Sequence, residues 1–232
     1  MPSPRPAPPE GAKRIGFVTI GQSPRDDVVP GMLPYLGPVQ VLEAGALDGL
    51  GPEEVAALAP RGPEQVLVTR LRDGSPVTVD KELIFPRLQE CVARLDAAGA
   101  AVIVLLCTGS FPKVAARALV LEPDRIVLHT VLAVARRANC VGVMVPAEDQ
   151  INAMRARWRA AGVDPVVAAG SPYGPLRARL EAARQLAAAG AELVVLDCMG
   201  YTQAMKEEIA AVVRCPVLVA HEAVARLAGA WL

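Results

Sequence analysis

The segment LDAAGAAVIVLLCTGS (Leu95–Ser110) decides the fold of this chain, because it recurs 91 residues later as LAAAGAELVVLDCMGY (Leu186–Tyr201). Nine of the sixteen aligned positions are identical, and the match places Cys107 over Cys198. Each copy runs from an alanine-rich helical pattern into a β-branched apolar run that ends in a cysteine. The repeat predicts two copies of one supersecondary unit.

A second, fainter repeat supports this interpretation. With a shift of 125 residues, EAGALDG (Glu43–Gly49) aligns with AAGSPYG (Ala168–Gly174). At nearly the same shift, Ile15-Gly16 aligns with Val141-Gly142. Both halves therefore share one order: an opening strand, a glycine-rich second strand, a helix and a strand that ends in cysteine.

Short β-branched runs alternate with helical patterns from Arg14 onward, which predicts parallel sheets covered by helices. One exception is VTRLRDGSPVTV (Val68–Val79), in which Asp73-Gly74 predicts a hairpin turn. We therefore expect an α/β protein with two pseudo-symmetric Rossmann-like lobes, parallel sheets and an interlobe cleft. The expected strands are RIGFVTI, VQVLEA, EQVLVTRL, AVIVLLC, CVGVMVP, PVVAAG, ELVVLDC and CPVLVA, and the main expected helices span 81–98, 147–161 and 175–189.

The expected boundaries divide the chain into an arm and two lobes. The first residues, MPSPRPAPPEGA, are rich in proline and predict a disordered arm over 1–12. The first lobe is expected over 13–128 and the second over 129–215. The last strand and helix, 216–232, are expected to return and pack on the first lobe.

Composition narrows the class of partner. Hydrophobic residues make up 53% of the 232 residues and aromatic residues only 3%, as expected of a layered globular protein. The 24 basic and 24 acidic residues balance without a dense basic run, which argues against nucleic-acid or membrane-surface binding. No stretch approaches the ~18 apolar residues of a membrane span. We expect a small anionic metabolite as partner, and a homodimer only by analogy with similar folds.

Cysteine and histidine usage points to a reducing compartment without a metal. The five cysteines are an odd number, show no CxxC spacing and follow no export signal, so reduced thiols in a cytoplasm are expected. Two histidines make a histidine-rich metal site improbable. No Walker sequence and no GxGxxG follows an expected strand, so we expect no cofactor.

Cys107 and Cys198 are the candidate catalytic residues. Ligands bind beyond the carboxyl ends of parallel strands, and both cysteines lie at such ends. If the lobes face one another about a pseudo-twofold axis, the two sulfurs approach the cleft from opposite sides. Thiols have a pKa near ~8.5 and can serve as acid and base on the two faces of one carbon. The alternative is that both copies merely inherited an inert cysteine, and Cys91, Cys140 and Cys215 are expected to be packing residues.

The expected helix starts beside the cysteines would hold the anionic part of a substrate. Ser110 and Thr202 are expected to cap helices, and Ser23 is expected to cap another in GQSPRDD, with Pro24 as its first residue. Arg70, Arg72 and Asp73 of the hairpin would cover the cleft, or form a solvated turn; His221 and Glu222 are expected to open the last helix. The residues expected to bind substrate are Gln22, Ser23, Arg25, Arg70, Thr108, Gly109, Ser110, Pro146, Gln150, Gly200, Tyr201 and Thr202.

The segments IGFVTIGQSPRDDVVPGMLPYL, TRLRDG, LLCTGS, VGVMVP and LDCMGY resemble the AroM protein family over nearly the whole chain after the arm. That family is similar in architecture to the aspartate/glutamate racemase superfamily, which includes hydantoin racemases, maleate isomerases and arylmalonate decarboxylases. The resemblance implies that Cys107 and Cys198 match the two catalytic cysteine positions. The amino-acid racemases carry Cys-Asn-Thr at the first of these, whereas this chain has Cys107-Thr108-Gly109.

These observations favour a cofactor-independent racemase, epimerase or isomerase that acts on a small carboxylate or amide-like compound with two cysteines. A one-cysteine decarboxylase or isomerase that uses Cys198 alone is the nearest alternative. A non-catalytic protein that binds a metabolite of aromatic amino acid metabolism is the alternative from another class.

Overall fold

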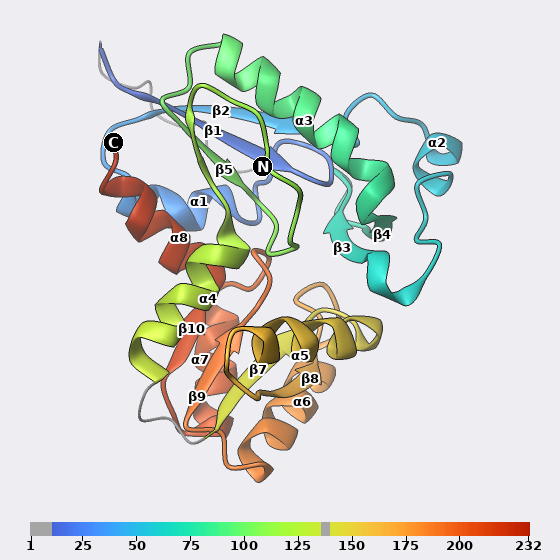
Figure 1. Cartoon of the computed structure of the whole chain (residues 1–232), viewed down its shortest axis with the longest axis vertical. Coiled ribbons are helices and arrows are strands. Elements are labelled where there is room, and N and C mark those ends of the chain that lie inside the picture. The colour runs from blue at the N-terminus through green and yellow to red at the C-terminus, as the bar shows by residue number, and fades with distance from the viewer. Residues whose placement is uncertain (1–10, 136–139) are drawn as a thin grey trace.

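The computed structural model describes residues 11–135 and 140–232, so most of the expected arm, 1–12, lies outside the described residues. Two parallel four-stranded sheets lie in separate lobes, the first above the second in Figure 1. Their strand orders, β2-β1-β5-β6 and β8-β7-β9-β10, are equivalent, which confirms the duplication. The strands are β1 (Arg14–Thr19), β2 (Gln40–Gly45), β5 (Val102–Leu105), β6 (Leu119–Leu121), β7 (Val141–Val145), β8 (Val166–Ala169), β9 (Leu193–Leu196) and β10 (Val217–Val219).

Helices connect the parallel strands, and a hairpin interrupts the first lobe. The hairpin consists of antiparallel β3 (Val66–Arg70) and β4 (Pro76–Asp80), with the expected turn between them. The helices are α1 (Val29–Met32), α2 (Pro52–Ala56), α3 (Lys81–Ala97), α4 (Pro123–Val134), α5 (Ile151–Ala160), α6 (Leu176–Ala188), α7 (Gln203–Val213) and α8 (Ala220–Gly229), with short 3₁₀ turns η1 (Leu33–Tyr35), η2 (Pro63–Gln65) and η4 (Glu148–Gln150). No helix among the described residues has both the length and the apolar character needed to cross a bilayer.

The sequence repeat coincides with equivalent packing in the two lobes. The shift of 91 residues places the end of α3 on the end of α6 and β5 on β9. In the first lobe, a Cβ at Gly16 would lie 2.9 Å from the side chain of Leu95. In the second, a Cβ at Gly142 would lie 3.4 Å from the side chain of Leu186, the residue equivalent to Leu95. Each glycine lets the long helix approach the opening strand of its sheet closely.

The end of the chain differs from the expected division into lobes. The assignment of 216–232 to the first lobe is wrong for the strand, because β10 pairs in parallel with β9. It extends the second sheet as β6 extends the first. Helix α8 does reach the first lobe, where it packs on α1, η1 and α4 (Figure 1). The expected boundary between 128 and 129 falls inside α4, a helix that the sequence patterns do not reveal.

Two expected helix starts are wrong. Residues 22–25 are irregular, 26–28 form a turn and α1 begins only at Val29. The Ser23 hydroxyl donates to Asp48 at 2.6 Å and the Arg25 backbone N–H donates to Glu43 at 2.8 Å, so this segment is held outside a helix. No helix follows Cys107, because the backbone of Ala115 pairs with the side chain of Gln89 on α3 in both directions. The Thr202 cap is confirmed, since its hydroxyl accepts the N–H of Met205.

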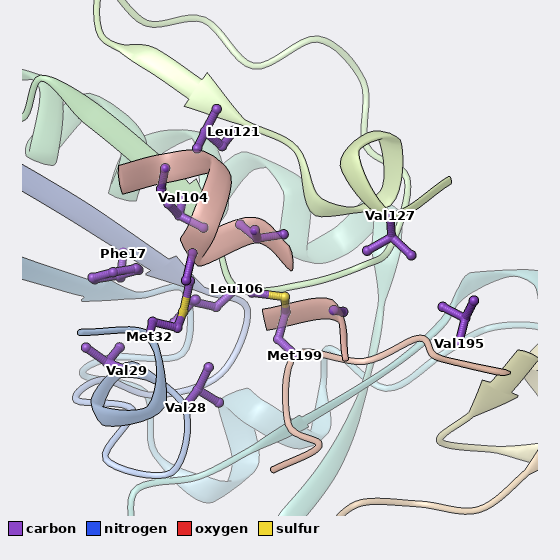
Figure 2. Close-up of a cluster of buried hydrophobic side chains, with 14 of the residues drawn as sticks. Phe17, Val28, Val29, Met32, Val104, Leu106, Leu121, Val127, Val195 and Met199 are labelled. Atoms are coloured by element: carbon purple, nitrogen blue, oxygen red, sulfur yellow. The ribbon is translucent and has the colours of Figure 1, made fainter. Parts of the chain in front are cut away.

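One apolar core joins the lobes. Phe17, Met32 and Val104 come from the first lobe, and Val195 and Met199 from the second, yet all belong to a single buried cluster (Figure 2). Val127 of α4 lies in the same cluster, as does Val224 of α8. Burial of this shared surface fixes the two sheets relative to one another, because apolar area removed from water is worth about 25 cal/mol per Å².

Asp80 supplies a test of how the fold orients α3. Its buried carboxylate accepts the N–H groups of Glu82 and Leu83 at 2.9 and 3.2 Å and pairs with Arg61 at 3.1 Å. The bond from Arg61 and those from the backbone lower the pKa of Asp80 to about 2. We expect Asp80→Ala to lower the free energy of unfolding at pH 7 by about 1–2 kcal/mol, as measured by urea denaturation.

The pH dependence of this loss follows from the lowered pKa. The stabilisation by Asp80 is present above its ordinary pKa of about 4 and is lost as the pH falls towards 2, so the difference between wild type and variant should shrink over that range. The exposed Asp73→Ala in the hairpin turn is the control and should cost clearly less than Asp80→Ala, because the Asp73 carboxylate binds only the nearby N–H of Ser75. Equal losses in the two variants would contradict the assignment.

Candidate active site

A cavity of about 270 Å³ lies between the lobes at the carboxyl ends of the strands. Both Cys107 and Cys198 line it. The other lining residues are Arg25, Glu64, Val66, Leu67, Val68, Lys81, Leu106, Thr108, Gly109, Ser110, Pro146, Gln150, Ala153, Met154, Arg157, Tyr173, Asp197 and Met199.

The two cysteines occupy equivalent positions. Cys107 is the second residue after β5 and Cys198 the second after β9. Each sulfur accepts the backbone N–H of the glycine two residues further on, at 3.2 Å from Gly109 and 3.5 Å from Gly200. Both are free thiols. The duplicated fold thus brings two like groups to one cavity from different lobes.

Burial makes both thiols weak acids. It raises the pKa of Cys107 to about 12 and that of Cys198 to about 11, against the opposing effect of the glycine N–H groups. The nearby Cys198 thiol further raises the pKa of Cys107. The helix start expected beside Cys107 is wrong, so no helix N-terminus lies next to this sulfur to favour its thiolate. At neutral pH both groups therefore carry their protons.

A buried ion pair ties the two strand ends together. Arg157 of α5 donates to the carboxylate of Asp197 at 2.7 Å and to the carbonyl of Thr108 at 2.9 Å. The Thr108 hydroxyl donates to the carbonyl of Asp197 at 3.1 Å. Because Thr108 follows Cys107 and Asp197 precedes Cys198, this network fixes the cysteines relative to one another.

Arg25 spans the lobes on another wall. Its Nε and Nη2 donate to Asp27 at 2.8 Å each, Nη1 donates to Thr19 at 2.9 Å, and Nη2 also donates to the hydroxyl of Tyr173 at 2.9 Å. Asp27 therefore occupies the bidentate edge of the Arg25 guanidinium, the edge that could otherwise bind a substrate carboxylate. Arg25 lines the cavity as part of a bridge to Tyr173 instead.

Lys81 is a cation that lines the cavity and is not paired with a carboxylate in the described part of the chain. It lies at the first position of α3 and lines the cavity. The other lining cations, Arg25 and Arg157, are paired with carboxylates, whereas Lys81 forms no ion pair within residues 11–135 and 140–232. A helix N-terminus favours acidic rather than basic residues, so this position gains nothing from a lysine structurally.

Eight of the fourteen expected site residues line the cavity: Cys107, Cys198, Arg25, Thr108, Gly109, Ser110, Pro146 and Gln150. The remaining six do not, and four of them serve the scaffold. Ser23 binds Asp48, Gln22 accepts the N–H of Arg72, Tyr201 donates to the Gly170 carbonyl, and Thr202 caps α7.

The last two expected residues also lie off the cavity lining. Arg70 donates to the Gly74 carbonyl inside its own hairpin. Gly200 lies under Tyr173, because a Cβ there would collide with the ring and hydroxyl. The hairpin tip is held to the first lobe, since Arg72 Nε donates to the Ser23 carbonyl at 2.8 Å. The cavity is bordered by Val66, Leu67 and Val68 of β3 and not by the arginines expected to cover it.

Sequence reasoning misses Lys81, Arg157, Tyr173 and Asp197. Two of these four residues carry a signal in the sequence. Tyr173 lies in AAGSPYG, the glycine-rich repeat, and Asp197 is a charge at the end of an apolar strand next to a candidate cysteine. Lys81 and Arg157 carry no comparable signal, because each is one basic residue among several on a helix.

The chain matches the family described as AroM protein over residues 15–232. It belongs to that family. No curated protein matches the chain. Solved structures similar to this AroM chain include unliganded arylmalonate decarboxylase (15% identity, 95% of this chain and 92% of that chain, TM-score 0.58) and the aspartate racemase of Picrophilus torridus (11%, 92% and 91%, 0.55). Glutamate racemase from Aquifex pyrophilus is also similar (15%, 94% and 84%, 0.58). At these identities the likeness establishes a shared two-lobed α/β fold.

The raised thiol pKa values predict how alkylation depends on pH. In the folded AroM chain, the iodoacetamide rate constants of Cys107 and Cys198 should rise about tenfold per pH unit up to about pH 10 without a plateau, because only the thiolate reacts. Peptide mass spectrometry measures each site. The same cysteines in urea should level off above pH ~9, in line with an ordinary pKa near ~8.5. A plateau below pH 9 in the folded protein would contradict the assignment.

Proposed function

We propose that this AroM protein is a cofactor-independent enzyme that moves a proton at a carbon beside a carboxylate or an amide-like carbonyl, as a racemase, epimerase or isomerase. The observation that carries the proposal is the presence of Cys107 and Cys198 in one cavity, delivered from equivalent strand ends of two lobes. The names of the similar structures, two racemases and a decarboxylase, support carbon-acid chemistry on this fold.

The proposed reaction uses the two sulfurs in opposite roles. One cysteine, ionised when substrate binds, takes the proton from carbon and becomes a thiol, and the electron pair stays on the substrate as an enolate. The other thiol gives its proton to the opposite face of the same carbon and becomes the thiolate. Proton exchange with solvent then restores the starting state. General acid and base catalysis of this kind contributes about 10²–10⁴-fold.

The cavity favours a small anionic substrate. Lys81 can bind a carboxylate, and Gly109 and the exposed Ser110 also line the cavity with polar groups. Neutralising the carboxylate makes the adjacent C–H more acidic, which helps a thiolate to remove the proton. Apolar side chains, among them Leu67, Met154 and Met199, line the rest of the cavity and suit an uncharged substituent. The free thiols agree with a cytoplasmic location, which stays a prediction.

Solvent exchange tests the proposal. Single enantiomers of aspartate, glutamate and substituted hydantoins are incubated with the protein in deuterated water and followed by NMR and chiral chromatography. We expect deuterium at the stereocentre of at least one compound, and a loss of about 10²–10⁴-fold in racemisation for Cys107→Ser and for Cys198→Ser. Cys140→Ser, outside the cavity lining, is the matched control and should keep its activity.

The outcomes separate the alternatives. Exchange at wild-type rate in both active-site serine variants would overturn two-thiol chemistry. Release of CO₂ from an arylmalonate that survives Cys107→Ser but not Cys198→Ser would indicate a one-cysteine decarboxylase. Thermal stabilisation by a metabolite without turnover, unchanged in both variants, would indicate a binding protein.

A further inference from the structure

We propose that Tyr173, held by Arg25, is a positioning residue that makes Cys198 the first of the two thiols to ionise, and so the base that begins the reaction. The catalytic part of this inference rests on the proposed function, whereas the order of ionisation is a property of the protein alone. No sequence motif indicated the bridge between Arg25 and Tyr173.

The bridge crosses from one lobe to the other. Tyr173 follows β8 in the second lobe, where its N–H donates to the Ser171 hydroxyl at 3.1 Å. Its phenol oxygen accepts Nη2 of Arg25, which comes from the loop after β1, at 2.9 Å. Arg25 is itself held by Asp27 and Thr19 and is 3% exposed. The phenol is therefore fixed at the cavity wall by a guanidinium that cannot easily turn away.

The same phenol lies beside Cys198. A Cβ at Gly200 would collide with the Tyr173 hydroxyl, so that hydroxyl lies directly against the glycine. The N–H of Gly200 in turn donates to the sulfur of Cys198. Because Arg25 donates to the phenol oxygen, the O–H of Tyr173 is directed away from Arg25, and its place against Gly200 leaves it available to the neighbouring Cys198 sulfur when that sulfur ionises. A donor aimed at sulfur stabilises the thiolate over the thiol.

The charged and titratable groups around Cys198 act in opposite directions. Burial raises the pKa of Cys198, while the Gly200 N–H, the Arg25 charge and the Tyr173 hydroxyl oppose that rise, and Asp197 adds to it. Tyr201 and Cys107 also face this sulfur, and burial raises the pKa of each above its ordinary value, so both are neutral over the range tested. Arg25 is the only cation among these groups around Cys198.

Among the residues that the structure describes, Cys107 has no equivalent bridge. In the glycine-rich repeat, Asp48 stands where the second lobe has Tyr173, and its carboxylate is bound to Ser23 and to the N–H of Gly45. Burial raises the pKa of Cys107, and the N–H of Gly109 opposes that rise. The neighbouring Cys198, Asp124 and Asp197 raise the pKa further. The duplicated fold thus supplies a stabilised sulfur in one lobe and a proton-bearing sulfur in the other.

In the reaction, Cys198 loses its proton to solvent and the thiolate accepts the Tyr173 hydrogen bond. It then takes the substrate proton, and the Cys107 thiol donates its own proton to the opposite face. After one turnover Cys198 is the thiol and Cys107 the thiolate, and exchange with solvent returns both to the starting state.

Tyr173→Phe tests the inference, because it keeps the ring over Gly200 and removes only the hydroxyl. Iodoacetamide labelling of the ligand-free protein between pH 8 and 10, read site by site by peptide mass spectrometry, should show Cys198 slowed about tenfold. Cys107 should change less than twofold. A merely loosened cavity would speed labelling of Cys198, so the sign of the change separates an electrostatic role from a structural one.

Tyr35→Phe is the matched control, since its hydroxyl lies 3.4 Å from Glu222 at the contact between η1 and α8 and it does not line the cavity. It should leave both labelling rates unchanged. Thermal unfolding of both variants checks folding. Thiolate absorbance at 240 nm, in a background that keeps Cys198 as the sole cysteine, gives a second reading, in which Tyr173→Phe should move the titration of Cys198 to higher pH.

An unchanged Cys198 rate and titration in Tyr173→Phe, or an equal slowing of Cys107, would overturn the inference. Neither result bears on the solvent-exchange assay, which judges the proposed function separately. A slowed Cys198 in a protein that exchanges none of the compounds would leave the order of ionisation standing and remove the catalytic role.

Discussion

The buried ion pair between Arg157 and Asp197 is the interaction on which the candidate site depends. Its carboxylate belongs to the residue before Cys198, and its guanidinium also donates to the carbonyl after Cys107. With the bond from the Thr108 hydroxyl, three hydrogen bonds join two strand ends from different sheets. Removing one partner of a buried pair leaves an uncompensated charge, which costs about 3–5 kcal/mol. The separation of the sulfurs is therefore held by polar contacts as well as by packing.

The shared apolar cluster explains why these contacts can form. The carboxyl ends of the two sheets face one cavity because Phe17 and Met32 of the first lobe pack in the same cluster as Val195 and Met199 of the second. Helices α4 and α8, which follow β6 and β10, pack on each other and belong to this cluster as well. Helices α4 and α8 thus occupy equivalent positions in the two halves, and α8 of the second half packs against the first lobe.

Sequence predicts the parts of this structure that depend on local pattern. Both sheets and the two equivalent cysteines follow from the repeat, because buried parallel strands are uninterrupted apolar runs. Strand β6 is only three residues, LVL, too short to show a period, and the partner of β10 is set by tertiary contact. The same limit applies to the site. Thr108, Gly109 and Ser110 follow Cys107 in sequence and are predicted, whereas Arg157 and Tyr173 reach the cavity from distant segments.

Duplication alone would give two equal sulfurs, and the differences between the copies are therefore where function should be sought. Asp48 in the first copy accepts a hydrogen bond from Ser23 of the same lobe, whereas Tyr173 in the second copy accepts one from Arg25 of the other lobe. A helix follows Cys198 after four residues, but none follows Cys107 before β6. The scaffold is symmetric because helices pack on the two sheets in equivalent ways. The cavity is asymmetric because Lys81 of α3 lines it from the first lobe and because its two thiols, Cys107 and Cys198, have different surroundings.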